Sequence, residues 1–342
     1  MTWLLYGATG YTGRLIARRA VARGMRPVLA GRSAAKLLPL AAELGLEHRV
    51  FGLDDPGAIR RGLKGVEAVA HCAGPFVRTA LPMARACVDT ATPYLDITGE
   101  IDVFESLCEL GPRAAAAGVV LLPGAGFDVV PTDCVAALLA DRLPDATQLD
   151  LAFLVGGGAS PGTARTALAG AAEGGRIRAG GEIRAVPVGS RQVRAAFPSG
   201  ARTVVSVPWG DVSTAYHSTG IPDITTYTAV PAPALAASRA LRLGPLRGAL
   251  TGLAGLVVRG PSERALGGTR SEVWGRARDA AGNTVTATLS GPNPYSMTAD
   301  SVLRIVERLP ALPAGFRTPS MALGADFAGT LEGVTVTMEA LR

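Results

Sequence analysis

The sequence predicts an α/β protein, in which a doubly wound parallel sheet is followed by an α+β domain with a mixed or antiparallel sheet. Short apolar runs alternate with helical patterns through the first 130 residues. Glycines spaced three apart follow the first apolar run, and the pattern becomes strand-rich from residue 147 onwards. Alternation of this kind is typical of parallel sheets whose right-handed crossovers cover both faces with helices.

Six strands are expected in the first part of the chain, each short and apolar enough to be buried on both faces. They are residues 3–6, 26–31, 49–53, 67–74, 93–99 and 118–126. Helical periodicity falls between them, at residues 12–23, 33–44, 79–91 and 101–117. These elements predict one domain over residues 1–130.

A different domain, for substrate binding and dimerisation, is expected over residues 131–292. Its strands are expected near 147–158, 183–188, 202–208, 212–219, 224–230, 270–278 and 284–290. Its helices are expected near 131–143, 161–173 and 232–258. A further helical segment begins at residue 293, and we expect residues 293–330 to pack back onto the first domain.

Composition excludes several classes of protein. A chain of 342 residues that is 48% hydrophobic can bury two cores, and no apolar run reaches the roughly 20 residues of a membrane span. The N-terminus lacks the pattern of a signal peptide, which predicts a cytoplasmic protein. The net charge of +6 comes from dispersed basic residues and does not indicate nucleic-acid binding. Four scattered cysteines and three histidines predict reduced thiols and no metal site.

The glycine run "GATGYTG" at residues 7–13 follows the first strand and opens the first helix. In that context Gly7 permits a tight turn, Gly10 lets backbone N–H groups approach a pyrophosphate, and Gly13 allows close helix–strand packing. The positive end of the helix dipole adds to the attraction. We therefore predict a Rossmann dinucleotide site rather than a turn without a ligand.

Doubly wound sheets bind ligands beyond the carboxyl ends of their strands. The residues that follow each predicted strand are therefore the expected cofactor ligands. They are Gly7, Thr9, Gly10, Tyr11, Thr12, Gly13, Arg32, Ser33, Leu53, Asp54, Ala73, Gly74, Pro75, Gly99, Gly124 and Gly126.

The end of the second strand predicts which dinucleotide is used. NAD-binding sheets usually place an acidic residue there to bind the ribose 2′-hydroxyl, whereas this chain has Arg32 and Ser33. A guanidinium and a hydroxyl suit a 2′-phosphate, which predicts NADP(H). The alternative is that Arg32 is a solvated surface side chain.

Several stretches together resemble one family. They are "YGATGYTG" (6–13), "CAGPF" (72–76), "YLDITGE" (94–100), "PGAGFDVVPTD" (123–133) and "GFRTPSMALGADF" (315–327). In this order they resemble the saccharopine dehydrogenase-like oxidoreductases, most of all the branch with the bacterial trans-acting enoyl reductases. The resemblance implies a Rossmann domain that binds an NADP-type dinucleotide, and an α/β substrate domain.

The short-chain dehydrogenases share such a glycine-rich opening but use a Tyr-x-x-x-Lys pair. The only lysines here are Lys36 and Lys64, and neither has a tyrosine four residues before it. That chemistry is excluded, and so is a lysine base in the second domain.

Hydride transfer often needs a proton donor, and the expected catalytic residues are Glu100, Tyr216 and His217. In a strand over 212–219, Tyr216 would share one face with Ser218, and His217 would lie on the other. A surface or core role for His217, and a helix-start role for Glu100, are the alternatives. The expected substrate-binding residues are Phe76, Thr98, Phe127, Asp128, Ser160, Gly162, Thr163, Ser218 and Tyr295.

We therefore expect an NADP(H)-dependent enzyme that reduces an activated C=C bond of an acyl or similar apolar substrate. The alternatives are a C=N reductase or amino-acid dehydrogenase of saccharopine type, and a dinucleotide-binding module without turnover. Leucines and arginines at helical spacing in residues 232–258 suit a membrane surface, an acyl chain or an acidic carrier protein, or else packing within a homodimer.

Overall fold

The computed structural model describes residues 1–156, 174–230 and 268–340. The chain divides into two compact units. Unit 1 consists of Met1–Phe127 and Tyr295–Ala322, and unit 2 consists of Asp128–Pro294 and Leu323–Arg342. A segment close to the C-terminus therefore completes the unit that carries the N-terminal glycines.

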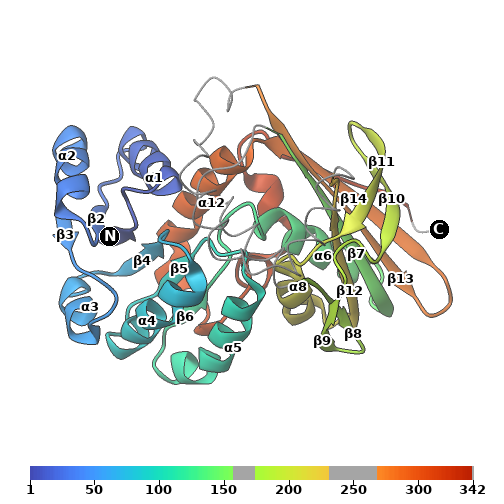
Figure 1. The fold of residues 1–342 in the computed structure, drawn as a ribbon, viewed down its shortest axis with the longest axis horizontal. Coiled ribbons are helices and arrows are strands. Elements are labelled where there is room, and N and C mark those ends of the chain that lie inside the picture. The colour runs from blue at the N-terminus through green and yellow to red at the C-terminus, as the bar shows by residue number, and fades with distance from the viewer. Residues whose placement is uncertain (157–173, 231–267, 341–342) are drawn as a thin grey trace, which may run out of the picture. The chain divides into compact units, whose positions relative to one another are not determined.

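Unit 1 is built on a seven-stranded parallel sheet in the order β15-β6-β5-β4-β1-β2-β3 (Figure 1). The strands are β1 (Trp3–Tyr6), β2 (Val28–Gly31), β3 (His48–Val50), β4 (Ala68–His71), β5 (Tyr94–Asp96), β6 (Val120–Leu122) and β15 (Gly315–Phe316). The helices are α1 (Tyr11–Ala22), α2 (Ala34–Leu44), α3 (Pro56–Gly62), α4 (Phe76–Asp89), α5 (Ile101–Ala116) and α12 (Pro294–Arg308). The winding reverses between β1 and β4, which confirms the predicted doubly wound sheet.

Helices on both faces explain why the strands of this sheet are apolar along their whole length. Every residue of β1, β2, β4, β5 and β6 is buried, whereas the edge strand β3 is largely exposed. On one face Val69, Tyr94 and Leu121 share a buried cluster with Met83 of α4 and Leu107 of α5. A one-sided sheet would instead alternate apolar and polar residues.

Unit 2 contains a mixed sheet whose main path runs β10-β11-β12-β7-β13-β14-β16, with β8 and β9 joined to β12 through β8. Its strands are β7 (Ala146–Val155), β8 (Gly175–Ala179), β9 (Glu182–Val186), β10 (Gln192–Phe197), β11 (Gly200–Ser206), β12 (Asp223–Thr228), β13 (Arg270–Asp279), β14 (Thr284–Pro292) and β16 (Thr335–Met338). Among these, β12 and β7 pair in parallel and the other described pairs are antiparallel. The predicted mixed sheet is confirmed.

Among the described residues of unit 2 the helices are α6 (Val130–Arg142) and α8 (Asp211–Thr219), and α13 (Pro319–Leu323) marks the boundary between the units along the chain. Short 3₁₀ turns occupy Leu309–Ala311 and Ala325–Thr330. Helix α6 packs tightly on β13, because a Cβ at Gly275 would lie 2.6 Å from Val135 Cγ1.

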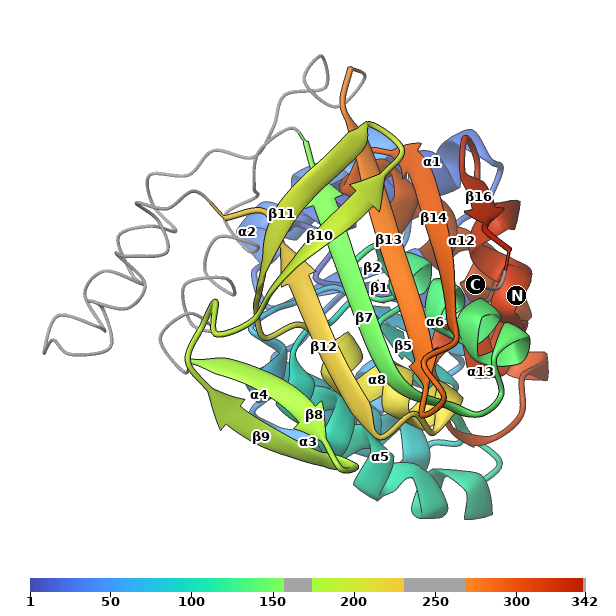
Figure 2. The same ribbon diagram turned by 90° about the vertical axis from the view of Figure 1, so that its right-hand side faces the viewer.

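The opposite face of this sheet is partly covered by the hairpin of β10 and β11, which Figure 2 shows lying over the neighbouring strands. Ala195 and Phe197 of β10 pack against Trp274 of β13 and Tyr227 of β12. The hairpin therefore turns one end of the sheet over onto its own face.

The strand expected over residues 212–219 is wrong, because these residues form helix α8. Its β-branched and aromatic content suggested a strand, but Gly210 precedes the helix and Gly220, with φ of +72°, ends it. Tyr216 and His217 are therefore neighbours on a helix, and the predicted division between two faces of a strand does not exist. The expected helices at 161–173 and 232–258 lie outside the described residues.

Candidate functional site

The glycine loop between β1 and α1 is shaped by contacts that exclude side chains. Gly7 has φ of +82°, and a Cβ there would lie 2.8 Å from the backbone nitrogen of Ala73. A Cβ at Gly13 would lie 2.3 Å from the carbonyl oxygen of Gly7. The first and third glycines are thus required by the fold itself, since the loop lies directly against the residues that follow β4 and against the first turn of α1.

Gly10 has a different environment. It is the N-cap of α1, and a Cβ there would meet only the Gly7 carbonyl oxygen, at 3.3 Å. Helix α1 has no side-chain cap and no acidic residue in its first turn. The first N–H groups of a helix have no partner within the helix, so this end of α1 can accept an anion.

At the start of the neighbouring helix α4, a carboxylate side chain already occupies the place where an anion could bind. The Glu100 carboxylate accepts hydrogen bonds from the backbone N–H groups of Phe76, at 3.1 Å, and Val77, at 2.7 Å. Glu100 therefore places its charge at the start of α4, where the helix dipole stabilises it. Glu100 is the N-cap of its own helix α5 but makes no side-chain cap there, so the helix start that its carboxylate occupies is that of α4 and not the expected one.

Arg32 and Ser33 follow β2 at the same edge of the sheet. Ser33 is the N-cap of α2, but its hydroxyl makes no capping hydrogen bond. Arg32 is exposed, and no carboxylate of the described residues pairs with it. The pKa of Tyr6 is raised to about 12 by burial, an effect that the charge of Arg32 opposes and the charge of Asp54 reinforces. A guanidinium and a hydroxyl without a capping role thus lie at the carboxyl end of β2.

Asp96, at the end of β5, holds two of the loops at this edge. Its carboxylate accepts hydrogen bonds from the N–H of Thr98, at 3.0 Å, the N–H of Gly124, at 3.1 Å, and the hydroxyl of Tyr94, at 2.7 Å. Its carbonyl oxygen accepts from Ala125 N–H, at 2.7 Å. One fully buried side chain thus fixes the loops after β5 and β6 relative to each other.

We expect Asp96→Asn to become more stable relative to the wild type as the pH rises from 4 to 7. Burial raises the pKa of Asp96 from 3.8 to about 6, although its hydrogen bonds act in the opposite direction. A raised carboxyl pKa means that the folded chain retains a proton that the unfolded chain releases, so stability is lost as the pH rises from about 4 to about 6. The shift corresponds to about 3 kcal/mol.

Urea unfolding of Asp96→Asn and the wild type at several pH values checks this prediction. Subtracting the two curves removes the titration of every other group. A difference in unfolding free energy that is the same at pH 4 and pH 7 would contradict the assignment.

The other predicted side chains of unit 1 also lie at the carboxyl edge or beside it. Leu53 and Asp54 follow β3; Ala73, Gly74 and Pro75, with a cis Gly74–Pro75 bond, follow β4; Gly99 follows β5; and Gly126 and Phe127 follow β6. Tyr295, in α12, is 8% exposed and packs edge-on against Tyr11, with ring centroids 4.8 Å apart. Tyr295 is thus a packing partner of the glycine loop.

The remaining predicted residues belong to unit 2 or lie outside the described residues. In α8, Tyr216 lies under the guanidinium of Arg178, 4.1 Å from ring centroid to Cζ, and its ring is 5.9 Å from that of His217. Ser218 donates to the carbonyl oxygen of Ala215 within the helix. Their roles stay predictions, as does that of Asp128. Ser160, Gly162 and Thr163 lie outside the described residues.

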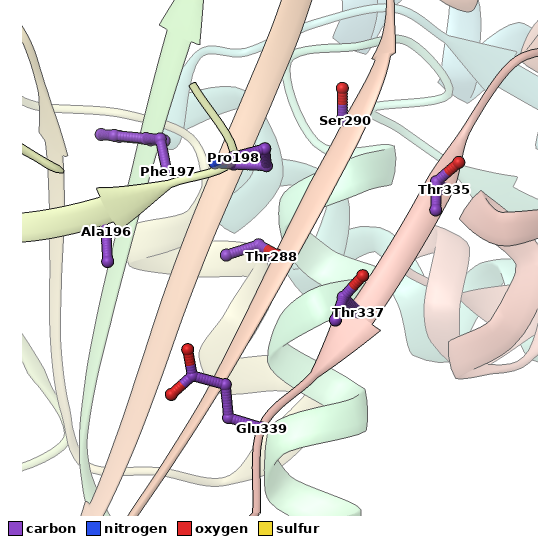
Figure 3. Close-up of a pocket in the computed structure, with 8 residues that line it drawn as sticks. All are labelled: Ala196, Phe197, Pro198, Thr288, Ser290, Thr335, Thr337 and Glu339. Atoms are coloured by element: carbon purple, nitrogen blue, oxygen red, sulfur yellow. The ribbon is translucent and has the colours of Figure 1, made fainter. Parts of the chain in front are cut away.

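Unit 2 has a groove of about 430 Å³ between the end of β10 and strands β14 and β16 (Figure 3). Thr288 and Ser290 face Thr337 and Thr335 across the paired strands, and Glu339 lies at one end. None of the groove's lining residues is a histidine, a cysteine or a basic residue. The groove therefore offers hydroxyl groups and a carboxylate but no cationic side chain to a phosphate, unlike the carboxyl edge in unit 1.

Within the described ranges, no helix combines the length and the apolar character needed to cross a membrane. No three His, Cys, Asp or Glu side chains come together there as a metal site.

Sequence reasoning missed Thr298 and the pairing of Tyr94 with Asp96. The Thr298 hydroxyl accepts a hydrogen bond from Phe127 N–H, 171 positions away, and no local pattern reveals such a contact. Tyr94 and Asp96 are two residues apart on one strand, so alternation alone could have placed both on the same face.

Comparison by sequence supports a dinucleotide site. A family model described as NAD(P)H-binding matches residues 7–93. A trans-acting enoyl reductase of Mycobacterium leprae is 35% identical over 138 residues, which cover 38% of this chain and 33% of that protein. A trans-acting enoyl reductase of Mycobacterium tuberculosis is 32% identical over the same coverage. The matched region thus spans about a third of the length of these relatives.

Comparison of structures supports the fold. Saccharopine dehydrogenase (L-Glu forming) from Saccharomyces cerevisiae matches with a TM-score of 0.62 at 14% identity, covering 99% of this chain and 100% of that one. Homospermidine synthase from Legionella pneumophila, solved in complex with NAD, matches with a TM-score of 0.64 at 11% identity, covering 99% and 91%. The chain therefore has the saccharopine dehydrogenase fold, with an NAD(P)H-binding Rossmann domain at its N-terminus and sequence similarity to the mycobacterial trans-acting enoyl reductases.

Proposed function

We propose that this protein is an NADP(H)-dependent oxidoreductase whose cofactor site is the carboxyl edge of the parallel sheet in unit 1. The observation that carries the proposal is the contrast between two helix starts. Glu100 occupies the start of α4, whereas the start of α1 is lined by glycines and has neither a cap nor an acid. A pyrophosphate fits at the start of α1, whereas the Glu100 carboxylate repels it from the start of α4.

The chain's own residues bind and orient the dinucleotide in this account. The backbone N–H groups at the start of α1 bind the pyrophosphate, and Arg32 with Ser33 binds the 2′-phosphate. The loops after β5 and β6, fixed by Asp96, border the nicotinamide half, because the adenosine half lies over β1 to β3. The nicotinamide supplies the hydride, and a side chain such as Tyr216 or His217 supplies the proton.

We infer an activated C=C bond of an acyl or similar apolar substrate as the hydride acceptor. The sequence similarity to proteins named trans-acting enoyl reductases supports this choice. Reduction of a C=N bond is the second candidate, supported by the fold shared with saccharopine dehydrogenase.

The cofactor assignment is tested by Arg32→Ala. We expect the wild type to bind NADPH more tightly than NADH, and Arg32→Ala to lose roughly 1.5–3 kcal/mol of NADPH binding with little change for NADH. Lys64→Ala is the matched control, since Lys64 precedes β4 and lies at the amino edge of the same sheet. Calorimetric titration measures both affinities, and equal loss for NADH and NADPH would refute the role of Arg32.

The substrate class is tested by following NADPH oxidation at 340 nm with α,β-unsaturated acyl thioesters and with cyclic imines. Turnover of the thioesters supports the proposal, and turnover of the imines alone favours the second candidate. NADPH binding without turnover of either class would point to a dinucleotide-binding module.

A further inference from the structure

We propose that Thr298, in helix α12, is a positioning residue for the nicotinamide half of the dinucleotide site. This inference rests on the proposed function and extends it to a residue that is 171 positions away from the loop it contacts. Thr298 holds the loop after β6, residues 124–127, in the conformation that borders the nicotinamide. Its own side chain does not need to touch the cofactor.

Helix α12 is anchored firmly alongside α1. Arg19 donates to the carbonyl oxygen of Ser296, at 2.8 Å, and Arg23 pairs with the buried Asp300. Asp300 also accepts from Arg304 Nε, at 3.0 Å. Because these contacts run along one side of α1, any group on the first turns of α12 is held at a fixed place in unit 1.

The first turns of α12 contact two loops at the carboxyl edge at once. Tyr295 packs its ring against Tyr11, the first residue of α1 after Gly10. One turn further on, the Thr298 hydroxyl accepts a hydrogen bond of 2.9 Å from Phe127 N–H. The helix therefore links the loop that binds the pyrophosphate to the loop that borders the nicotinamide.

The loop after β6 is held from both ends. Asp96 binds the N–H groups of Gly124 and Ala125, and Thr298 binds that of Phe127. The loop also lies closely against Thr298, because a Cβ at Gly126 would be 3.0 Å from Thr298 Cγ2 and 3.1 Å from its hydroxyl oxygen. Thr298 thus supplies both a hydrogen bond and a steric limit, and no other described side chain binds Phe127 N–H in this way.

Loss of the Thr298 hydroxyl should therefore weaken binding of the nicotinamide half of the cofactor and leave binding of the adenosine half unchanged. Without the hydroxyl, Phe127 N–H loses its acceptor in a buried place, and the end of the loop is free to shift. Arg32 and Ser33, which the proposed function assigns to the adenosine half, follow β2, whereas the contacts of Thr298 are with the loop after β6. NADPH binding should weaken, whereas binding of 2′,5′-ADP, which lacks the nicotinamide half, should not.

The test is calorimetric titration of Thr298→Val, Thr298→Ser and wild-type protein with NADPH and with 2′,5′-ADP. Valine keeps the shape of threonine and removes the hydroxyl, whereas serine keeps the hydroxyl. We expect Thr298→Val to bind NADPH about tenfold more weakly, with 2′,5′-ADP binding within about twofold of wild type. Thr298→Ser should bind NADPH nearly as well as wild type.

Ser301→Ala is the matched control, because Ser301 is buried on the same helix and its hydroxyl has no hydrogen-bond partner among the described residues. It should bind both ligands as the wild type does. If Thr298→Val does not fold, Gly126→Ala disturbs the same contact from the loop side and should show the same selectivity.

Three outcomes overturn the inference. Thr298→Val binds NADPH as tightly as wild type; or it loses both ligands equally, as a general fold defect would; or Thr298→Ser fails to restore NADPH binding. A wild-type protein that binds neither ligand would instead refute the proposed function, and the inference with it.

Discussion

Replacing Gly10 with alanine is expected to weaken NADPH binding by about 100-fold while leaving stability nearly unchanged, because a methyl group would interrupt two charge-assisted backbone contacts to the pyrophosphate. We expect the fold to accommodate the substitution with a small shift of the Gly7 carbonyl group. The φ of Gly10 is −71°, which alanine adopts readily, and the added Cβ meets only the Gly7 carbonyl oxygen at 3.3 Å.

Gly13→Ala separates this effect from an effect on the fold. Its Cβ would lie 2.3 Å from the Gly7 carbonyl oxygen and 2.9 Å from Ala8 Cα, so the loop or the helix must move. We expect Gly13→Ala to lose both stability and binding. Gly329→Ala, in unit 2, is the neutral control, since its Cβ meets only Val336 Cγ2 at 3.8 Å.

Calorimetry with NADPH and urea unfolding of the three variants provide the two measurements. Gly10→Ala is the decisive variant. If it binds NADPH as the wild type does, the glycines serve only as a turn and the pyrophosphate does not lie at the start of α1.

We expect His71 to cause the second large effect, which is a loss of wild-type stability as the pH falls. The imidazole lies at the end of β4, fully buried among the rings of Tyr6, Phe76 and Tyr94 at 5.4–6.2 Å. Neither ring nitrogen has a hydrogen-bond partner among the described residues. Burial therefore lowers the pKa of His71 from 6.5 to about 3.

A lowered histidine pKa means that the unfolded chain takes up a proton that the folded chain refuses. The contribution to stability is complete above pH 6.5 and is lost as the pH falls towards 3, at about 1.4 kcal/mol per pH unit and about 5 kcal/mol in all. Asp96 acts in the opposite direction between pH 4 and 6. The two groups therefore partly cancel in the wild type, and each becomes visible when the variant that lacks it is compared with the wild type.

His71→Leu tests this by removing the titrating group and the two unsatisfied nitrogens. At pH 7.5 we expect it to be as stable as the wild type or more so, since a buried polar group without a partner costs about 1–3 kcal/mol. By pH 5 the variant should be more stable than the wild type by about a further 2 kcal/mol. Urea unfolding at both pH values gives the result, and a gap that does not widen on acidification would show that His71 is not held neutral.

Much of unit 1 could be predicted from the sequence because each element carries its own signal. Buried parallel strands are short apolar runs, and the glycine spacing places a tight turn at a known point of the sheet. Even helix α3, which was not predicted, has local signals, since Asp55 caps it through Gly57 N–H and Pro56 is its first residue. That helix was missed only because it is short.

Unit 2 was less predictable because its local preferences conflict with its packing. The segment Asp211–Thr219 contains two serines, two threonines, a valine and a tyrosine, yet it forms a helix that packs on α6. The strands β8 and β10 are short and interrupt their apolar residues with arginines, of which Arg178 of β8 is buried and Arg194 of β10 is exposed, and neither strand is expected from the sequence. The apolar residues of β10 become buried only where its hairpin with β11 folds over the sheet, which no window of sequence describes.

The residues of the candidate site also fall into a group that the sequence predicts and a group that it does not. The cofactor residues of unit 1 follow from strand order, because parallel strands bring all their carboxyl ends to one edge. Thr298 and the environment of His71 depend on segments far apart in the chain. No rule of sequence spacing relates these segments, so the contacts of Thr298 and the surroundings of His71 can be identified only in the folded structure.

Hydrogen exchange of the wild type with and without saturating NADPH tests the central claim most directly, because it reports where the dinucleotide lies. The account predicts slower exchange in peptides that cover residues 7–13, 31–33 and 124–127. Protection confined to the sheet of unit 2, or no protection at saturating NADPH, would contradict it.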